Sequence, residues 1–490
     1  MAFRRQERQN TGMSSCSRRD FLRTGLAGSA LLFTSGLPAQ AAADRGEARR
    51  ARNVIFLVSD GMSLGTLTMT ERHLRRQEGR GTHWLGLYGR PDLRRALMDT
   101  CSANSPVTDS AAAASAWGCG HKVKNGAINY APDGRPRTPI LRLARAAGKG
   151  TGLVTTATIT HATPAGFAAQ VEARSDEGLI AEQYLEVGVD VLLGGGAKFF
   201  DPTKRPDGRD LFGDYARAGY AVVRDAAGLR AAKASGRLLG TFAPEHLPFS
   251  LDHRADPMLV AKIPTLAEMA RAALARLAPH ERGFVLQIEG ARVDHAAHAN
   301  DIGGLLYDQL AFDDAVGAAL EFAAGRDDTL VIVTSDHGNA NPGLNGAGGS
   351  FTSRGGSYGD TQDCFDRVAR FRQTNVWTLA GLGPESTAAQ VRERVHAATR
   401  LEFETDEVEM LRQALRKEHR EGYRVRNAPL VAYGQILANH TSVGWTGTQH
   451  TTDYSELAAF GPGSEAIGGL VQNNALFGVM TRALGLPVPA

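Results

Sequence analysis

The 490-residue sequence has few cysteines, almost no net charge and no long apolar run. Of its 4 cysteines, Cys16 lies near the N-terminus, so the other three allow at most one internal disulfide. Cys101 and Cys119 are the candidates for that bond, and free thiols are the alternative. No segment beyond the N-terminal region has a run of about 18 apolar residues, which excludes a membrane-spanning helix there. The 56 glycines follow no fixed period, which excludes a collagen-like repeat.

The net charge of +3 arises in the first 43 residues. This segment has six arginines against Glu7 and Asp20, a balance of +4, so the rest of the chain carries −1. A chain without excess positive charge lacks the attraction for phosphate backbones that nucleic-acid binding requires, and we expect no nucleic-acid partner. Hydrophobic residues make up 42% of the sequence, which excludes disorder as the main state and provides for a large core.

Residues 1–43 have the pattern of an export signal. A basic stretch ends at Ser17-Arg18-Arg19-Asp20-Phe21-Leu22-Arg23, an uncharged run of small and apolar residues covers 24–37, and small residues at 39–43 offer a cleavage site. The uncharged run is shorter than the roughly 20 residues that span a membrane. The paired arginines resemble a twin-arginine signal, which predicts the export machinery of that name as a partner, removal of the segment, and a periplasmic or secreted protein. An uncleaved N-terminal tail is the alternative.

Short apolar runs alternate with helical patterns along the rest of the chain. We expect strands at 53–59, 152–157, 189–193, 284–289 and 329–334, and helices at 111–117, 139–147, 264–277 and 301–324. Near-continuous apolar strands that alternate with helices predict an α/β fold, with a large, mostly parallel sheet covered by helices on both faces. Ligands of such sheets bind at the carboxyl ends of the strands.

We expect residues 44–490 to form a single catalytic domain with two insertions. Residues 339–363 are rich in Gly, Ser and Asn, which predicts a long loop over the ligand site. Residues 384–418 are charged and helical in pattern, with a helix start at Asp406-x-x-Glu409 that resembles a capping box.

Acidic residues and histidines gather where the predicted strands end. Asp60 follows the first strand, and the further candidates are Glu289, Asp294 and His298 at and after the strand at 284–289, Asp336 and His337 after the strand at 329–334, and His450 in a later polar stretch. Carboxylate and imidazole together are zinc ligands, while carboxylate and hydroxyl oxygens suit magnesium. An ordinary turn is the alternative for Asp60, and a surface pair for Asp336 and His337. Their recurrence at successive strand ends indicates a metal centre.

A candidate nucleophile precedes the helix at 111–117. Ser110 follows Asp109 at the helix N-terminus, where free N–H groups favour an alkoxide or a bound phosphate. Arg174 has a guanidinium that can bind two phosphate oxygens. A plain N-cap serine and an exposed helical arginine are the alternatives for these two residues.

Six motifs, in order over most of residues 50–475, resemble those of the alkaline phosphatase family. They are Phe56-Leu-Val-Ser-Asp60-Gly-Met, Thr108-Asp-Ser110-Ala with Ala-Trp117, His161-Ala-Thr163-Pro with Arg174, Glu289-Gly-Ala-Arg-Val-Asp294-His-Ala-Ala-His298, Thr334-Ser-Asp336-His337-Gly, and His450-Thr with Ala459-Phe-Gly-Pro462. Six motifs in a fixed order are far more specific than any one of them. The resemblance implies hydrolysis of small-molecule phosphate monoesters and, as is typical of the family, a homodimer.

The resemblance also implies two Zn²⁺ ions and one Mg²⁺ ion, and it gives each site residue a role. Matched by position, the first zinc site is Asp294, His298 and His450, the second is Asp60, Asp336 and His337, and the magnesium site is Asp60, Thr163 and Glu289, with His161 near it. Ser110 matches the serine that becomes phosphorylated, Arg174 the arginine that holds phosphate, and Asp109 the residue that orients Arg174. Two cations can hold the attacking and leaving oxygens of an in-line displacement, which agrees with these roles.

Two positions depart from the best-known bacterial pattern of the family. His161 stands where that branch has an aspartate, and His295 stands where it has a lysine. Because His161 is near the third metal, zinc or cobalt could compete with magnesium there. We expect His295 to contact a metal ligand, or to contact phosphate through water, rather than to bind a metal itself. His440 is the rival of His450, since both precede a threonine, and we prefer His450 for its spacing to the Ala459-Phe-Gly-Pro segment.

A phosphodiesterase or phosphonate hydrolase of the same superfamily is the main alternative function. Those enzymes usually have threonine at the position of Ser110, and they generally lack a residue like Glu289. A sulfatase needs Cys or Ser in a C/S-x-P-x-R context, which Ser110-Ala-Ala-Ala-Ala lacks. A noncatalytic, metal-stabilised binding protein on the same scaffold is the alternative from another class. The presence of every expected ligand and of the nucleophile argues against it.

Overall fold

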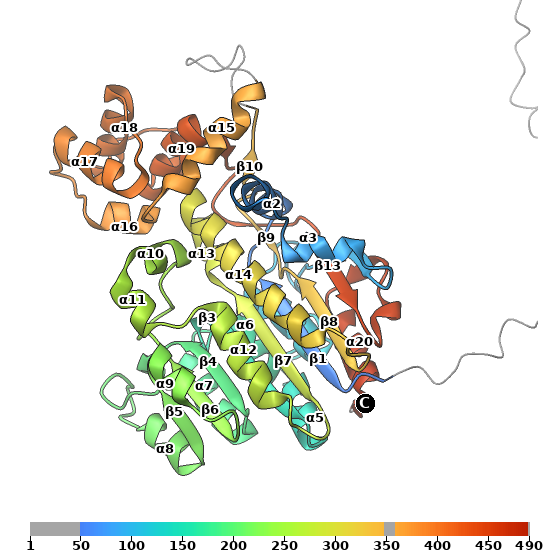
Figure 1. Cartoon of the computed structure of the whole chain (residues 1–490). Helices are drawn as coiled ribbons and strands as arrows, with labels where there is room; N and C mark the ends of the chain where they lie inside the picture. The colour runs from blue at the N-terminus through green and yellow to red at the C-terminus, as the bar shows by residue number, and fades with distance from the viewer. Residues whose placement is uncertain (1–49, 347–357, 489–490) are drawn as a thin grey trace, which may run out of the picture. The chain divides into compact units, whose positions relative to one another are not determined.

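The computed structural model describes residues 50–346 and 358–488. They lie in one compact unit of the chain, Arg49–Ala490 (Figure 1). The expected export signal at 1–43 and residues 347–357 of the expected loop lie outside the described residues. Among the helices described, none is long and apolar enough to cross a membrane. Cys101, Cys119 and Cys364 are free thiols, so the candidate disulfide between Cys101 and Cys119 is not formed.

One large sheet of ten strands runs through the described residues. Its strands are β1 (Asn53–Ser59), β2 (Arg94–Asp99), β3 (Gly150–Thr158), β4 (Val191–Gly195), β5 (Tyr220–Val223), β6 (Arg237–Thr241), β7 (Phe284–Gly290), β8 (Thr329–Thr334), β13 (Ser455–Phe460) and β14 (Gly469–Gln472). Their order in the sheet is β14-β2-β13-β8-β1-β7-β3-β4-β6-β5. Neighbouring strands are parallel except around β13, which is antiparallel to both β2 and β8. The large, mostly parallel sheet confirms the predicted fold class.

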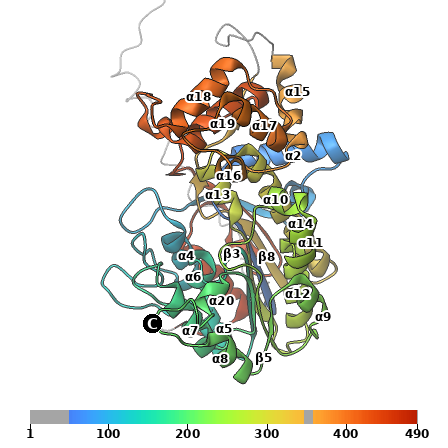
Figure 2. The ribbon, with the colours of Figure 1, turned by 90° about the vertical axis from the view of Figure 1, so that its left-hand side faces the viewer.

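Helices cover both faces of this sheet because its central strands are apolar on both sides. Ile55 and Leu57 of β1 belong to one core, while Val54, Phe56 and Val58 belong to the other. The first core is closed by α2 (Leu64–Glu78), α3 (His83–Gly86), α9 (Ala226–Ala231), α10 (Ser250–Ala255), α11 (Pro257–Lys262), α12 (Leu266–Leu277), α13 (Arg292–His298) and α14 (Ile302–Ala323). The second is closed by α4 (Ser110–Cys119), α5 (Ile140–Ala146), α6 (Ala162–Ala168), α7 (Glu177–Val187), α8 (Leu211–Arg217) and α20 (Ala475–Leu484). Figure 2 shows α12 and α14 on one side of the strands, and α5, α7 and α20 on the other.

Helices α4 and α6 pack in direct backbone contact, which two glycines permit. A Cβ at Gly118 would lie 2.0 Å from the carbonyl oxygen of Gly166, and a Cβ at Gly166 would lie 2.6 Å from the side chain of Ala114. Both distances are far inside van der Waals contact, so a larger residue would force the helices apart. Ser110 on α4 and Thr163 on α6 are therefore held at a fixed separation.

A group of helices occupies the segment from 361 to 441. Its members are α15 (Thr361–Phe365), α16 (Asn375–Ala380), α17 (Ala388–Thr399), α18 (Thr405–Leu415) and α19 (Pro429–Thr441). The expected helical pattern at 384–418 corresponds to α17 and α18. The capping box expected at Asp406 and Glu409 is wrong: the backbone N–H of Glu404 donates to the carboxylate of Glu407, so α18 begins two residues earlier.

The expected loop at 339–363 contains two short strands in its described part. β9 (Gly338–Asn339) pairs with β12 (His450–Thr451), and β10 (Gly343–Leu344) pairs with β11 (Val443–Gly444). The pairing of β9 with β12 sets His450 opposite Asn339. It therefore brings a residue from near the C-terminus to the end of β8.

Candidate active site

Three neighbouring strands carry carboxylates at the same edge of the sheet. In the register of β1 with its two neighbours, Val58 lies opposite Glu289 of β7 and Thr334 of β8. Asp60 comes two residues after Val58, and Asp336 comes two residues after Thr334. All three carboxylates are fully buried. The parallel register thus gathers the acids at the carboxyl ends of the strands, where the sequence predicted a site.

Asp294, His298 and His450 lie together. Asp294 Oδ2 is 3.3 Å from His298 Nε2, one turn along α13, and Asp294 Oδ1 is 3.5 Å from His450 Nε2. Nδ1 of His298 donates to the carbonyl of Thr448, and Nδ1 of His450 donates to that of Thr108. Because a carbonyl oxygen only accepts, each neutral ring has its lone pair on Nε2, and the two lone pairs face each other at 3.1 Å. Facing lone pairs beside a carboxylate fit a cation between them.

Asp60, Asp336 and His337 form a second group next to Ser110. His337 Nε2 is 3.1 Å from Asp336 Oδ2, 3.6 Å from Asp60 Oδ1 and 3.4 Å from Ser110 Oγ. Neither carboxylate oxygen of Asp60 accepts a hydrogen bond within the described part of the chain. Burial and the charge of Asp336 raise the pKa of Asp60 well above its ordinary value. A bound cation would remove this repulsion, so the buried carboxylates fit a metal.

Asp60 also belongs to a third group, with Glu289 and His161. One ligand atom from each lies within 4.8 Å of the others. Burial raises the pKa of Glu289 to about 7, against a hydrogen bond of 2.5 Å that Thr155 donates to it. Thr163 is buried on α6, which packs against β7. Carboxylate and hydroxyl oxygens suit magnesium and imidazole suits zinc, so this donor set fits either ion.

The three groups overlap into one cluster. Within the described ranges, the side chains that could hold an ion form the sets Asp294, His337 and His450; Asp60, Asp336 and His337; and Asp60, His161 and Glu289. Asp60 and His337 each occur in two sets. The first set has His337 in the place expected for His298, although His298 Nε2 also lies close to both Asp294 and His450. The cluster fits the three-ion centre that the sequence resemblance implies.

Ser110 is the first residue of α4, and Asp109 is the N-cap of that helix. Asp109 Oδ1 accepts the backbone N–H of Ala112, and Asp109 Oδ2 accepts a hydrogen bond of 3.1 Å from Arg174 Nη1. The helix N-terminus supplies a positive field at Ser110. Arg174 lies in a turn, not in the helix considered from the sequence. Its Nη2 donates to His161 Nε2 at 3.0 Å, so two side chains hold the guanidinium near the serine.

The structure separates the two histidines that the sequence left as rivals. His440 lies on α19, where its Nε2 is 3.1 Å from the Glu407 carboxylate and its ring stacks on Phe403. His450 is the one that reaches Asp294. His295 belongs to none of the ion-binding sets found among the described residues, and its role stays a prediction.

No sequence pattern pointed to two residues of this region, Asn339 and His246. Asn339 donates to Asp294 Oδ1 at 2.7 Å, and the β9–β12 pairing positions it. His246, in the loop after β6, has its ring centroid 4.6 Å from that of His295 and 5.7 Å from that of His161. Burial lowers the pKa of His246 to about 4, and burial with the charge of Arg292 lowers the pKa of His295 to about 3.

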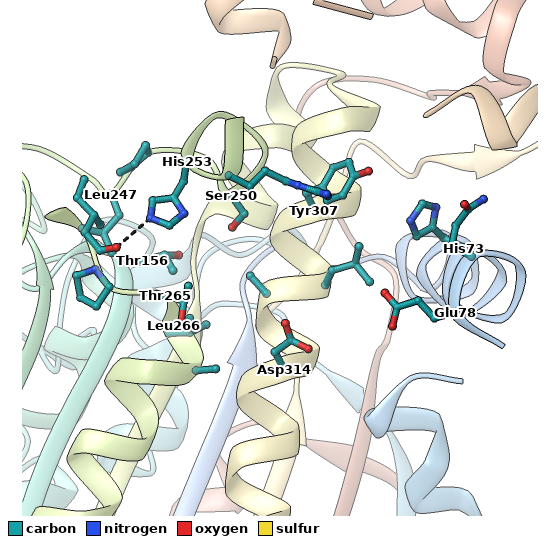
Figure 3. A pocket seen from close by; sticks show the side chains of 18 of the residues that line it. His73, Glu78, Thr156, Leu247, Ser250, His253, Thr265, Leu266, Tyr307 and Asp314 are labelled. Carbon is teal, nitrogen blue, oxygen red and sulfur yellow. Dashed lines mark hydrogen bonds between the residues drawn. The ribbon is translucent and has the colours of Figure 1, made fainter. Parts of the chain in front are cut away.

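A separate cavity of about 450 Å³ lies among α2, α10, α12 and α14 (Figure 3). His73, Glu78, Tyr307 and Asp314 are among the residues that line it, and the predicted catalytic and metal-binding residues are not. Thr156 lines the cavity and accepts the backbone N–H groups of residues 291 and 292 at the start of α13. The cavity therefore lies next to a residue that holds the start of α13, but it contains neither the acids nor the serine of the site.

Comparison with known proteins identifies the family. A family model described as alkaline phosphatase matches residues 51–486. The chain belongs to the alkaline phosphatase family. The resemblance seen in the six motifs is thereby confirmed, and the protein is a phosphatase.

Known alkaline phosphatases match most of the chain. The crystal structure of Thermus thermophilus alkaline phosphatase aligns with a TM-score of 0.82 at 38% identity, over 92% of this chain and 96% of that chain. Alkaline phosphatase 4 of Bacillus subtilis is 30% identical over 89% of each chain. Streptomycin-6-phosphate phosphatase of Streptomyces griseus is 39% identical over 65% of this chain and 80% of its own length. The family is metal-dependent and hydrolyses phosphate monoesters, for which the buried cluster has suitable donors.

Proposed function

We propose that this alkaline phosphatase hydrolyses small-molecule phosphate monoesters through a phosphoserine formed at Ser110. The proposal rests on the position of Ser110 Oγ, 3.4 Å from His337 Nε2 at the edge of a buried cluster of carboxylates and imidazoles. A serine at a helix N-terminus is in a field that favours its deprotonated form. The neighbouring Arg174 supplies a cation for the phosphoryl oxygens.

The proposed cofactors are two Zn²⁺ ions and one Mg²⁺ ion. The residues that would hold them are Asp294, His298 and His450 for the first zinc, Asp60, Asp336 and His337 for the second, and Asp60, Thr163 and Glu289 for magnesium, with His161 beside it. When bound, such ions lower the pKa of a coordinated hydroxyl and neutralise charge that develops on the attacking and leaving oxygens. The facing lone pairs of His298 and His450 support this assignment, as does the carboxylate of Asp60, which accepts no hydrogen bond from the described residues.

The residues of the chain would act in two displacements. Ser110 Oγ forms a bond to phosphorus while the bond from phosphorus to the ester oxygen breaks; the serine hydroxyl loses its proton, the ester oxygen gains one, and the alcohol leaves. The oxygen of a water molecule then bonds to phosphorus, the bond to Ser110 Oγ breaks, and the serine hydroxyl is restored. Arg174 donates to two phosphoryl oxygens in both steps, and Asp109 keeps its guanidinium aligned.

A comparison of three ester classes tests this function. We expect kcat/KM for an aryl phosphate monoester to exceed that for a matched diester and a matched sulfate ester by at least about 10³-fold, because the proposed site is complementary to a dianionic phosphoryl group. Steady-state assays with the three aryl esters give the ratios. Chelation should remove the monoesterase activity, and added zinc should restore it. Faster hydrolysis of the diester would assign the chain to a different activity.

The alternative functions have less support from the site. Ser110 stands where phosphodiesterases and phosphonate hydrolases of the superfamily usually have threonine, and Glu289 belongs to the third ion-binding set. A noncatalytic binding role conflicts with membership in a family of phosphatases. The domain limits 44–490 stay a prediction from the sequence pattern, and the homodimer stays a prediction from the family resemblance.

We also propose that residues 1–43 are a twin-arginine export signal and that the mature enzyme is periplasmic or secreted. Changing Arg18→Lys together with Arg19→Lys should leave the precursor in the cytoplasm, because lysine does not replace the paired arginines that such a signal requires. Cell fractionation followed by immunoblotting measures this. Arg4→Lys with Arg5→Lys is the matched control, with the same charges outside the motif, and should be exported normally. Wild-type export of the first double variant would exclude the pathway.

A further inference from the structure

Two histidines beside the proposed catalytic site take no part in the bond changes of the proposed reaction, and the sequence predicts for His295 only a contact with a metal ligand or with phosphate through water. His246 lies in the loop after β6 and His295 lies on α13, with their ring centroids 4.6 Å apart. Their centroids are 5.7 and 5.9 Å from that of His161, whose Nε2 is 3.0 Å from Arg174. The pair therefore lies next to the arginine that is proposed to hold the transferred phosphate.

Hydrogen bonds fix where each ring has its proton. The backbone N–H of Thr158 donates to His246 Nδ1 at 3.0 Å, and Arg292 Nη1 donates to His295 Nδ1 at 2.7 Å. A backbone N–H and a guanidinium can only donate, so Nδ1 is the acceptor in both rings and Nε2 bears the hydrogen.

Arg292 is itself held in place, which makes the orientation of His295 firm. Its guanidinium lies 3.6 Å over the ring of Phe249, and the carboxylates of Asp308 and Asp252 stabilise its charge. Thr158, the partner of His246, ends β3. Both rings are thus oriented by fixed donors of the scaffold, not by solvent.

The Nε2–H groups of His246 and His295 suit a hydrogen-bond acceptor and not a metal ion. Within residues 50–346 and 358–488, Nε2 of neither ring forms a hydrogen bond, and both side chains are partly exposed. A nitrogen that bears a hydrogen has no lone pair for a cation, so the pair cannot ligate an ion in this arrangement. Two N–H donors on rings whose centroids are 4.6 Å apart match the oxygens of a carboxylate or a phosphate.

We propose that His246 and His295 together bind an anionic group of the substrate other than the phosphoryl group that is transferred. The proposal rests on the proposed hydrolysis of phosphate monoesters and adds a substrate preference to it. Arg292 contacts His295 and Arg174 contacts the neighbouring His161, and their charges favour an anion against those of Asp294 and Glu245. A monoester with a carboxylate or a second phosphate a few bonds from the ester oxygen would contact both sites at once.

A matched series of small substrates tests the preference. It consists of 2-hydroxyethyl phosphate, phosphoglycolate and 1,2-ethanediol bisphosphate, which share a two-carbon skeleton and differ in the second group. For the metal-loaded wild type we expect a lower KM for one or both anionic members than for the neutral one. In His246→Phe the KM of each preferred anionic substrate should rise about tenfold relative to that of 2-hydroxyethyl phosphate, the size of one hydrogen bond to a charged group. The member that responds identifies the group as carboxylate or phosphate.

Two further variants separate recognition from structure. His246→Gln keeps an N–H donor and should retain the preference to within about threefold. His253→Phe is the matched control, because His253 uses its Nε2 on the carbonyl of Ile263 in the cavity wall (Figure 3), and its ratio of KM values should equal that of the wild type.

The outcomes that overturn the proposal are distinct from failure of the proposed function. Equal KM values for all three substrates in the wild type overturn the preference without any variant. An equal loss on all three substrates in His246→Phe shows a structural role instead. If the wild type hydrolyses none of the three, nor an aryl phosphate, the proposed hydrolysis itself is wrong.

Discussion

Replacing Ser110 with alanine should lower kcat/KM for an aryl phosphate by at least about 10³-fold while the zinc content stays near that of the wild type. The hydroxyl is the proposed nucleophile, and water cannot use the helix field and the nearby imidazole in the same position. Ser110 Oγ is also the only side-chain atom lost beyond Cβ, so the ion-binding side chains keep their places. Phosphate release measures the activity, and elemental analysis of the purified protein measures the metal.

Ser115→Ala is the matched control on the same helix. Its hydroxyl is buried and accepts the backbone N–H of Asn129 at 2.8 Å, away from the acids of the site. We expect this variant to lose some stability and to keep its specific activity within about threefold of the wild type. Turnover by Ser110→Ala above a few per cent of wild type would show that the nucleophile is misassigned.

Changing Asp60→Asn should have opposite effects on the metal-free and the metal-loaded protein. Asp60 occurs in two of the three ion-binding sets, so its loss should lower the bound metal by at least one equivalent per chain and the activity by about 10³-fold or more. Without metal, the same change removes a buried carboxylate repelled by Asp336, and we expect the free energy of unfolding to rise by about 1–3 kcal/mol. Thermal or urea unfolding measures the change in the free energy of unfolding, with chelator for the metal-free protein and without it for the metal-loaded protein.

Asp190→Asn provides the comparison for a buried acid with partners. Asp190 is 6% exposed and accepts from Arg145 Nη1 at 3.0 Å and from the backbone of Thr151 at 2.9 Å. Its replacement should destabilise the protein in both metal states and leave the metal content unchanged. If Asp60→Asn also destabilises the metal-free protein, the carboxylates of the cluster are not in mutual repulsion and the case for a cation at Asp60 weakens.

The central strands could be predicted from sequence because both of their faces are buried. β1, β7 and β8 are buried at every residue and are mostly apolar, and the site acids lie at or just after their carboxyl ends. β14, the edge strand, and its neighbour β2 were missed because exposed residues such as Arg95, Leu97 and Leu470 interrupt any regular pattern there. β13 is buried, but its antiparallel direction depends on its neighbours and not on its own residues.

The site residues also fall into two classes: those that the sequence could identify and those that it could not. Residues in local motifs, such as Asp60 and Ser110, could be identified in the sequence with their surroundings. The proposed role of His246 depends on a loop meeting α13 in space, and that of Arg292 on which nitrogen of His295 it contacts. Neither contact corresponds to a fixed spacing of residues along the chain, so a single sequence could not reveal it.

The order of strands in the sheet also decides when a site can first exist. β1 lies between β7 and β8, which come from the second half of the chain, and His450 arrives only when β12 pairs with β9. Such distant contacts close late in folding, so neither a nascent chain nor a truncated one has a centre where ions can assemble. Ion capture would then report that folding is complete. If the proposed export in the folded state is right, the ions would bind before the chain leaves the compartment in which it is made.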